Sequence, residues 1–489
     1  MVTGVREATA PTPALIFRRP PADQVPSRSE RGPGAWLAIL IVALIASNQT
    51  QVRLLLFDGL MSVRPDAVVL IGMILFLALS THRYGWRPWN TATVLLGLVA
   101  AAVLLRSLWP VAFSDPEPLF VDRSAGVGAP SWMGATHSKG LVTSLLLVSY
   151  VALTIAVSAF VRQPRVGPGL ANLAANVLVG SITAYALIFL ALLIQSVATT
   201  GLNPTLWTVE IRGIDISRVS DVSLFGIGPD QGVVFATGAI LAGSRAAFRT
   251  RRRRALVASA LILLTATLLS FSRGAWLVAF VGFLILLLLK SRFSRMIAGP
   301  YIVAFALVLA GLSGFAQTVQ GDAVARLFLG TDSGTIGARL QQWGVMLAAL
   351  MQQPLGGFGA EGYRPFTSGF PGENFPLEIA FSGGLLVLVA WTAGQLIIVR
   401  RSLGQVSALR RRADDTVIPF MLALFGYTVG TMTNESGWDP IYWLLMGVVV
   451  GAVYRVPGDQ PSPQGERLIV RRLGLDGVAR LGPNNVKPR

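Results

Sequence analysis

Long apolar runs separated by short polar stretches dominate the pattern along this chain. Most of them approach or exceed the roughly 20 residues that a helix needs to cross a bilayer. The pattern therefore predicts an all-α polytopic membrane protein with about twelve transmembrane helices and both termini in the cytoplasm. The runs are 34–57, 66–80, 91–109, 140–161, 170–198, 223–243, 255–271, 274–289, 297–316, 377–399, 416–433 and 441–454.

The stretch from Ala255 to Leu289 is too long for one span and contains a single charged residue, Arg273. We predict two short helices that meet at a turn around Arg273. Basic residues flank both outer ends, at 251–254 and from Lys290 onward, so the positive-inside rule assigns those ends to the cytoplasm. Arg273 then faces the outer side, where it is either a functional group or an arginine that reaches lipid phosphates.

Composition agrees with a membrane protein and narrows the chemistry. Hydrophobic residues make up 53% of the chain, mean hydropathy is +0.61 and charged residues make up 13%, against about 25% in soluble domains. The net charge of +17 does not indicate nucleic acid, because most of the 41 Lys and Arg residues flank helices on the proposed cytoplasmic side. The lack of cysteine excludes disulfides and cysteine catalysis. The two histidines fall on opposite sides of the predicted membrane, which argues against a histidine metal site.

Three regions are expected along the chain. Residues 1–33 predict a disordered basic, proline-rich cytoplasmic tail, 34–455 a transmembrane domain, and 456–489 a cytoplasmic tail. Long ordered loops are usually functional. The largest outer loop precedes the tenth span and includes a helix-like stretch at 338–352. The outer segments are 110–139, 199–222 and 317–376.

Two glycine patterns have weak functional value. Gly357, Gly359 and Gly362 match G-x-G-x-x-G, but no predicted strand precedes them and the segment faces away from cytoplasmic nucleotides. Gly447 and Gly451 form G-x-x-x-G, which indicates close helix packing.

Outer-face arginines suggest the kind of ligand. A guanidinium stays charged and donates two parallel hydrogen bonds, which suits a lipid phosphate or pyrophosphate. A nearby carboxylate could act as a general base, and tryptophans such as Trp438 lie near the proposed outer helix ends. The outer-face candidates are Arg212, Arg218, Arg273, Arg339 and Arg364, with the acids Glu373, Glu378, Glu435 and Asp439.

Short sequence elements follow one another in a specific order between about residues 170 and 455. They are Leu269–Trp276 (LSFSRGAW), Ala338-Arg339 with Trp343, Pro354–Gly359 (PLGGFG), Glu373–Leu377 (ENFPL) and Gly383–Leu386 (GGLL). In order and spacing they resemble the O-antigen ligase and O-antigen polymerase superfamily.

The resemblance implies an integral membrane glycosyltransferase with a GT-C-like helical fold. Its donor would be an oligosaccharide on undecaprenyl pyrophosphate, and its acceptor a glycan or glycolipid hydroxyl. Transfer would occur at the periplasmic face of the bacterial inner membrane, without nucleotide sugar, metal or other cofactor. Membrane lipid and other polysaccharide-assembly proteins would be its partners.

The resemblance also implies roles for single residues. Arg273, and more loosely Arg218 and Arg339, correspond to arginines that hold the pyrophosphate. Ligases that act on lipid A core usually have His-Asn where this chain has Glu373-Asn374, so the chain looks more like the polymerases, with a ligase as the alternative. The remaining substrate-binding candidates are Arg212, Arg364, Asn374, Trp343 and Tyr363.

Alternative roles stay open for two of these residues. We predict Glu373 as the base that deprotonates the acceptor in an inverting transfer, but it could instead be a cap or form a loop ion pair with Arg364. Arg339 could lie on an interfacial helix face, paired with Asp332.

A lipid-linked oligosaccharide transporter or flippase is the alternative from another class. It would also have about twelve spans and basic cavities, but it predicts interrupted helices and midplane charges in two similar halves. The sequence shows no such repeat, and the charges of the candidate site concentrate at the outer rim. A non-enzymatic envelope scaffold has no positive support.

Overall fold

The structure, a computed structural model, is described for the parts of the chain that carry the helical bundle. The described residues are 33–48, 54–56, 61–63, 65–82, 89–108, 132–163, 167–200, 208–211, 214–217, 229–248, 252–270, 272–288, 299, 302–303, 336–364, 366, 374–411, 417–432 and 436–455.

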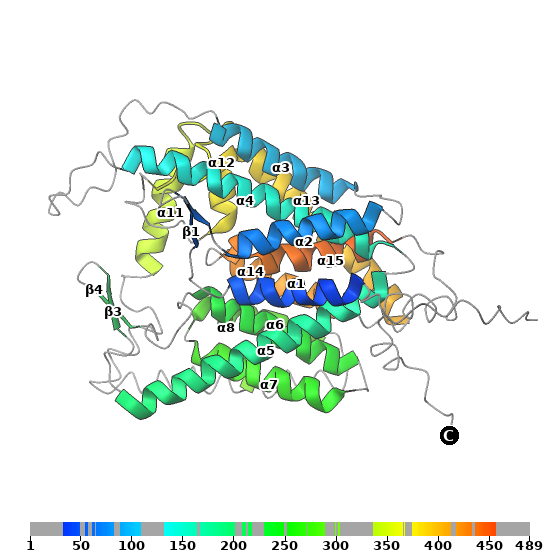
Figure 1. The fold of residues 1–489 in the computed structure, drawn as a ribbon. Coiled ribbons are helices and arrows are strands. Elements are labelled where there is room, and N and C mark those ends of the chain that lie inside the picture. Colours follow the sequence, from blue (N-terminus) through cyan, green and yellow to red (C-terminus); the bar gives the residue numbers. More distant parts are fainter. Residues whose placement is uncertain are drawn as a thin grey trace, which may run out of the picture.

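Helices make up nearly all of the described chain (Figure 1). The first part forms α1 (Pro33–Asn48), α2 (Pro65–His82), α3 (Thr91–Leu108), α4 (Trp132–Val161) and α5 (Gly167–Thr200). The second part forms α6 (Pro229–Phe248), α7 (Arg253–Leu269), α8 (Arg273–Leu288), α11 (Ile336–Leu350), α12 (Phe375–Gly383), α13 (Leu385–Arg411), α14 (Val417–Thr431), the 3-10 turn η4 (Ser436–Trp438) and α15 (Pro440–Val453).

Two short antiparallel hairpins are additions to the predicted all-α fold. In the first, β1 (Leu54–Leu56) pairs with β2 (Met61–Val63). In the second, β3 (Thr208–Ile211) pairs with β4 (Ile214–Ser217). The predicted run 34–57 was therefore too long, because α1 ends at Asn48 and the end of the run belongs to a strand.

The prediction that residues 255–289 form two helices is confirmed, because α7 and α8 are separate and meet at a turn. Gly232, near the start of α6, lies against Ser270 and Ser272 of this turn. Gly282 of α8 lies against Ile240 of α6. The chain therefore reverses at the turn, and α8 returns parallel to α6.

The prediction of one span over 377–399 is wrong. The chain breaks at Gly384, which has φ 84°, so that α12 and α13 are separate helices. A side chain at Gly384 would also overlap the carbonyl oxygen of Leu355. Glycine is required here by both its backbone conformation and its close approach to a neighbouring segment.

Apolar helices of membrane-spanning character support the polytopic fold. Among the described residues, four helical segments are long and apolar enough to cross a bilayer, and five shorter apolar helices accompany them. The count of twelve spans, the extent of the large outer loop and the division into tails and membrane domain stay predictions, and most of the run 297–316 lies outside the described residues. The four long segments are Thr91–Leu108, Gly140–Val161, Gly169–Gln195 and Leu385–Gln405.

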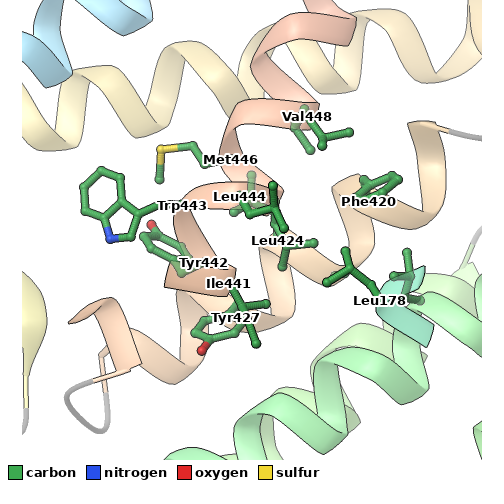
Figure 2. Close-up of a cluster of buried hydrophobic side chains, with 14 of the residues drawn as sticks. Leu178, Phe420, Leu424, Tyr427, Ile441, Tyr442, Trp443, Leu444, Met446 and Val448 are labelled. Atoms are coloured by element: carbon green, nitrogen blue, oxygen red, sulfur yellow. The ribbon is translucent and has the colours of Figure 1, made fainter. Parts of the chain in front are cut away.

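The core is built around α15, whose residues are all buried. A helix that is apolar on every side is stable only when other helices or lipid surround it. Figure 2 shows α15 beside α14, with Tyr442 and Tyr427 at the contact and Leu178 of α5 nearby. Gly447 and Gly451 lie directly against Val157 and Ser158 of α4, which confirms the packing role predicted for G-x-x-x-G.

The two ends of the bundle differ in charge. At one end, Arg245 donates to the side-chain oxygens of Asn172 and Asn176, at 2.8 Å each. At the same end, Arg455 donates to the Val161 carbonyl at 2.8 Å, and Arg401 lies over the Tyr454 ring. The start of α7, with Arg252, Arg253 and Arg254, also lies there. We call this the basic end; α11 and α12 lie at the opposite end (Figure 1).

Candidate active site

The candidate site lies at the end of the bundle opposite the basic end, where residues 351–364 connect α11 toward α12. The C-terminal end of α3 anchors this connecting segment. Arg106 donates through Nε to the Gly357 carbonyl at 3.0 Å and through Nη2 to Gln353 Oε1 at 2.8 Å. Ser107 Oγ accepts from the Ala360 amide at 3.0 Å. A long-range contact therefore fixes the position of the segment.

The glycines of the G-x-G-x-x-G pattern serve backbone geometry. Gly357 and Gly359 have φ of 62° and 85°, which glycine adopts without steric cost. The backbone around these glycines forms hydrogen bonds with the end of α12. The Phe358 amide donates to the Phe381 carbonyl at 2.7 Å, and the Gly359 amide donates to the Ser382 carbonyl at 2.9 Å. The pattern follows a helix rather than a strand, so it lacks the context of a dinucleotide site.

An aromatic cluster packs against the connecting segment 351–364. Phe358 stacks on Phe381 with ring centroids 4.7 Å apart, and Phe366 meets Phe381 edge to face at 5.7 Å. Tyr363, predicted to bind substrate, is buried in this cluster and meets Phe381 edge to face. The Arg364 guanidinium also lies over the Tyr363 ring, 5.8 Å from its centroid. Substrate binding by this ring stays a prediction.

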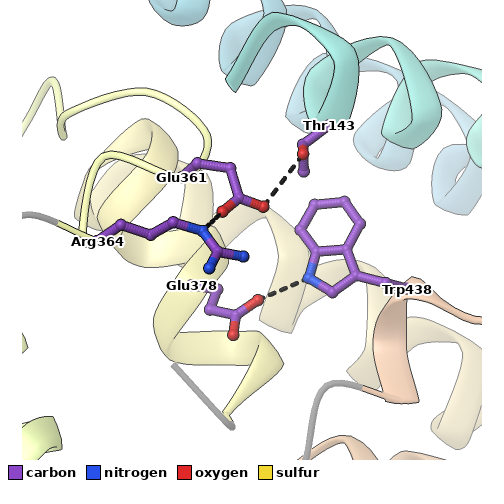
Figure 3. Close-up of polar contacts among 5 residues, drawn as sticks. All are labelled: Thr143, Glu361, Arg364, Glu378 and Trp438. Carbon is purple, nitrogen blue, oxygen red and sulfur yellow. Dashed lines mark hydrogen bonds and ion pairs between the residues drawn. The ribbon is translucent and has the colours of Figure 1, made fainter. Parts of the chain in front are cut away.

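An ion pair that the sequence analysis missed joins Glu361 to Arg364 (Figure 3). Thr143 of α4 donates to Glu361 Oε1 at 3.1 Å. Glu361 has φ 61°, a conformation that is unfavourable for a residue other than glycine and that is often found at functional sites. Arg364 has its carboxylate partner in Glu361, whereas the alternative pair with Glu373 lies outside the described residues. The available signal was an acid three residues before an arginine in a glycine-rich run.

A second carboxylate, Glu378, lies in the first turn of α12 and is only 1% exposed. Its Oε2 accepts from Trp438 Nε1 at 2.6 Å (Figure 3). The Trp438 ring also meets Phe375 edge to face at 5.1 Å. Trp438, predicted as an interfacial ring, thus makes internal contacts that connect η4 to α12.

Asn374 is the N-cap of α12. Its Oδ1 accepts from the Leu377 amide at 3.0 Å, and its Nδ2 donates to the Met432 carbonyl at 3.2 Å. The side chain therefore fixes both the start of α12 and the end of α14. Its contact with substrate stays a prediction. Asp439 caps α15 in the same way, with Oδ1 accepting from the Ile441 amide.

The turn before α8 places the backbone of Arg273 at the first position of that helix. Ser272 Oγ accepts from the Ala275 amide at 3.3 Å, as an N-cap does. Trp276 Nε1 donates back to the Thr267 carbonyl at 3.1 Å, which joins the two helices across the turn. Arg273 therefore lies at a helix N-terminus, where the helix dipole favours anions.

The other predicted residues divide into two groups. Arg339 and Trp343 lie on α11, where both are partly buried. The structure thus brings α11, residues 353–364 and the start of α12 together. Besides Asn374, these segments contain four predicted residues, which are Arg339, Trp343, Tyr363 and Arg364. Arg212, Arg218, Glu373 and Glu435 lie outside the described residues.

Comparison with known proteins identifies the region that contains this arrangement. Residues 258–392 match the family model described as O-antigen ligase. This match confirms the resemblance to the O-antigen ligase and polymerase superfamily. The matched region extends from α7 into α13 and includes Arg273, Arg339, Arg364 and Asn374. A search of curated proteins gives no match.

The superfamily match and the helices together support two coarse statements. The apolar helices indicate a multi-pass inner-membrane protein. The match indicates glycan transfer of the O-antigen ligase or polymerase type.

Proposed function

We propose that this protein transfers an oligosaccharide from undecaprenyl pyrophosphate to a glycan hydroxyl at the periplasmic face, and that it extends a polysaccharide chain. The observation that carries the proposal is the family match, because its residues 258–392 contain the α8 N-terminus, α11 and the capped start of α12. Arginines and carboxylates in this region supply the groups that such a transfer needs.

Charge distribution supports the periplasmic location. The arginine-rich end of the bundle corresponds to the cytoplasmic side under the positive-inside rule. The connecting segment 351–364, Glu378 and the Arg273 turn lie at the other end. A donor carried by a membrane lipid would present its pyrophosphate at that surface.

Stabilisation of the leaving group is the role we assign to the arginines. As the bond from sugar C1 to the phosphate oxygen breaks, negative charge grows on the pyrophosphate, and arginines already in place stabilise that charge more than they stabilise the bound donor. Arg273 also lies at the N-terminus of α8, where the helix dipole favours a bound anion. Arg339 would contribute from α11, with Arg212 and Arg218 as further ligands. Undecaprenyl pyrophosphate is a good leaving group, so no acid is needed.

The acceptor hydroxyl must lose its proton as its oxygen attacks C1 from the opposite face. In this proposal Glu373, which directly precedes the N-cap Asn374, accepts this proton. A new bond from C1 to the acceptor oxygen replaces the bond to phosphate, so one displacement inverts the anomeric centre. The leaving group departs as undecaprenyl pyrophosphate.

Transfer to lipid A core is the second candidate function, since the matching family model is described as O-antigen ligase. Glu373-Asn374 in place of His-Asn favours the polymerase. The two functions use the same donor chemistry and differ in the acceptor.

Purified protein in lipid nanodiscs, supplied with a defined lipid-linked repeat unit and lipid A core, would test the proposal. We expect wild-type protein to lengthen the glycan, and Glu373→Gln to abolish lengthening while it retains donor binding. Glu466→Gln, the same change in the C-terminal segment, is the matched control and should be fully active. Full activity of Glu373→Gln would refute the assignment of Glu373 as the general base.

The acceptor decides between the remaining functions in the same assay. Transfer to lipid A core without lengthening would identify a ligase. If no covalent product forms while the lipid-linked unit changes leaflet in vesicles, the protein is a transporter and the proposal fails.

A further inference from the structure

Helix α11 has an exposed apolar stripe that the transfer reaction does not explain. Leu340, Leu347 and Met351 are 51–67% exposed. Their spacings of seven and four residues place them along one side of the helix, and the Met351 amide continues the helical bonding by donating to the Leu347 carbonyl at 3.1 Å. Large aliphatic side chains aligned in this way are costly in water.

The other sides of α11 have different surroundings. Met346, Ala349 and Leu350 are buried against the aromatic cluster that includes Phe358 and Phe381. Gln341 is exposed and lies on a different side of the helix from both the buried face and the apolar stripe. The helix therefore has a protein-facing side, an apolar exposed side and a polar exposed side. Between Ile336 and Leu350 it contains no acidic residue.

The apolar stripe continues onto a surface that faces lipid. The next exposed aliphatic residue, Leu355, lies beside Gly384 at the α12–α13 break. Directly after that break, Leu386 and Val389 are exposed on the candidate membrane span Leu385–Gln405. The exposed surface of a membrane span is covered by lipid, and the segment that follows α11 packs against the start of this span through the Leu385 amide, which donates to the Pro354 carbonyl at 2.7 Å.

The direction of α11 fits the same conclusion. Helices such as α1, α2 and α6 run along the bundle, whereas α11 lies steeply across that direction at the end opposite the basic end (Figure 1). If the bundle spans the membrane, a helix across its end lies close to the membrane plane.

We propose that α11 is an interfacial helix that rests on the lipid bilayer, with Leu340, Leu347 and Met351 immersed in the boundary between headgroups and acyl chains. Amphipathic helices of this kind bury their apolar side about 5–10 Å into that boundary. Gln341 then faces water, and the buried face joins the helix to the candidate site. The partner is the lipid surface itself, not a second protein.

Membrane contact would set the depth of Arg339, which directly precedes Leu340. Its guanidinium would lie at the level of the lipid phosphates, as arginines beside apolar interfacial surfaces do. This consequence rests on the proposed function, since only a lipid-linked donor brings a reacting phosphate to that level. The membrane contact of α11 does not depend on it.

The cysteine-free chain allows a direct test. Single variants Leu347→Cys and Gln341→Cys, each carrying a nitrobenzoxadiazole fluorophore, are reconstituted in vesicles of phosphatidylethanolamine and phosphatidylglycerol. We expect the probe at 347 to emit at shorter wavelength than the probe at 341. Lipids with a spin label near the headgroup should quench the probe at 347 several-fold more than they quench the probe at 341.

Both variants change exposed positions, so folding is expected to be retained, and the reading needs no enzymatic activity. Failure of the glycan-transfer assay would therefore leave this result intact. Water-like emission at 347 without lipid quenching would overturn the proposal. Shorter-wavelength emission at 347 that resists lipid quenching and disappears as the protein is diluted in lipid would identify a second copy as the occupant, and would also overturn it.

Discussion

Trp438 donates a 2.6 Å hydrogen bond from its indole nitrogen to the buried carboxylate of Glu378, across 60 residues of sequence. The bond joins the connection between α14 and α15 to the first turn of α12. One turn earlier, Asn374 makes a second link by donating to the Met432 carbonyl. The start of α12, whose N-cap Asn374 directly follows Glu373, is thus held by the neighbouring helix pair, which is the kind of support that a catalytic group requires.

Trp438→Phe should destabilise the protein by about 1–3 kcal/mol, because it removes the donor while the carboxylate of Glu378 stays buried. Glu378→Gln should cost less, since an amide oxygen can still accept the indole hydrogen bond. Thermal unfolding in one detergent would compare the variants. The double variant should lose less than the sum of the two single losses, and an additive loss would show that the two side chains are not coupled.

Gly384→Ala should strongly reduce stability or folding yield, because alanine is strained at φ 84° and its methyl group would overlap the Leu355 carbonyl. The loss should exceed about 1 kcal/mol. Gly404→Ala in α13 is the matched control, because a methyl group there meets no neighbour within 4 Å. The control should be neutral or slightly stabilising. Equal folding yields of the two variants, measured by detergent chromatography, would contradict the break at Gly384.

Positions 250 and 274 should lie on opposite sides of the membrane, since α7 (Arg253–Leu269) separates them. Thr250→Cys and Gly274→Cys, introduced singly, can be labelled with an impermeant thiol reagent in intact spheroplasts and in inverted vesicles. We expect 274 to react from the periplasmic side and 250 from the cytoplasmic side. Labelling of both from the same side would refute the assignment of the two ends.

Arg273→Lys should reduce glycan transfer at least tenfold with normal membrane levels. Lysine keeps the charge but loses the planar pair of donors that fits a pyrophosphate. Arg273→Ala should reduce glycan transfer further and should also reduce donor binding. Arg401→Lys, at the basic end, is the matched control. If both Arg273 variants retain wild-type transfer, this arginine contacts lipid phosphates and the donor binds elsewhere.

The candidate site was predicted only in part. Arg273, Arg339 and Asn374 were predicted because they stand in short elements with a recognisable order, and Arg364 because it is an outer-face arginine; the family match covers the region of all four. Glu361 was missed because its importance depends on the positive φ and on Thr143, which lies 218 positions away. The buried position of Tyr363 was equally invisible, since an aromatic residue in a loop has no sequence pattern that distinguishes packing from binding.

The sequence by itself determined the apolar helices, the split of residues 255–289 and the location of the basic flanks. These features depend on local hydrophobicity and charge, which determine membrane insertion and orientation over segments of about 20 residues. Only the tertiary structure decided that the run at 377–399 breaks at Gly384, because the break requires contact with Leu355. It also decided the pairing of Glu378 with Trp438 and the three-sided surroundings of α11. Contacts between distant segments depend on how whole helices pack, and no local pattern specifies that packing.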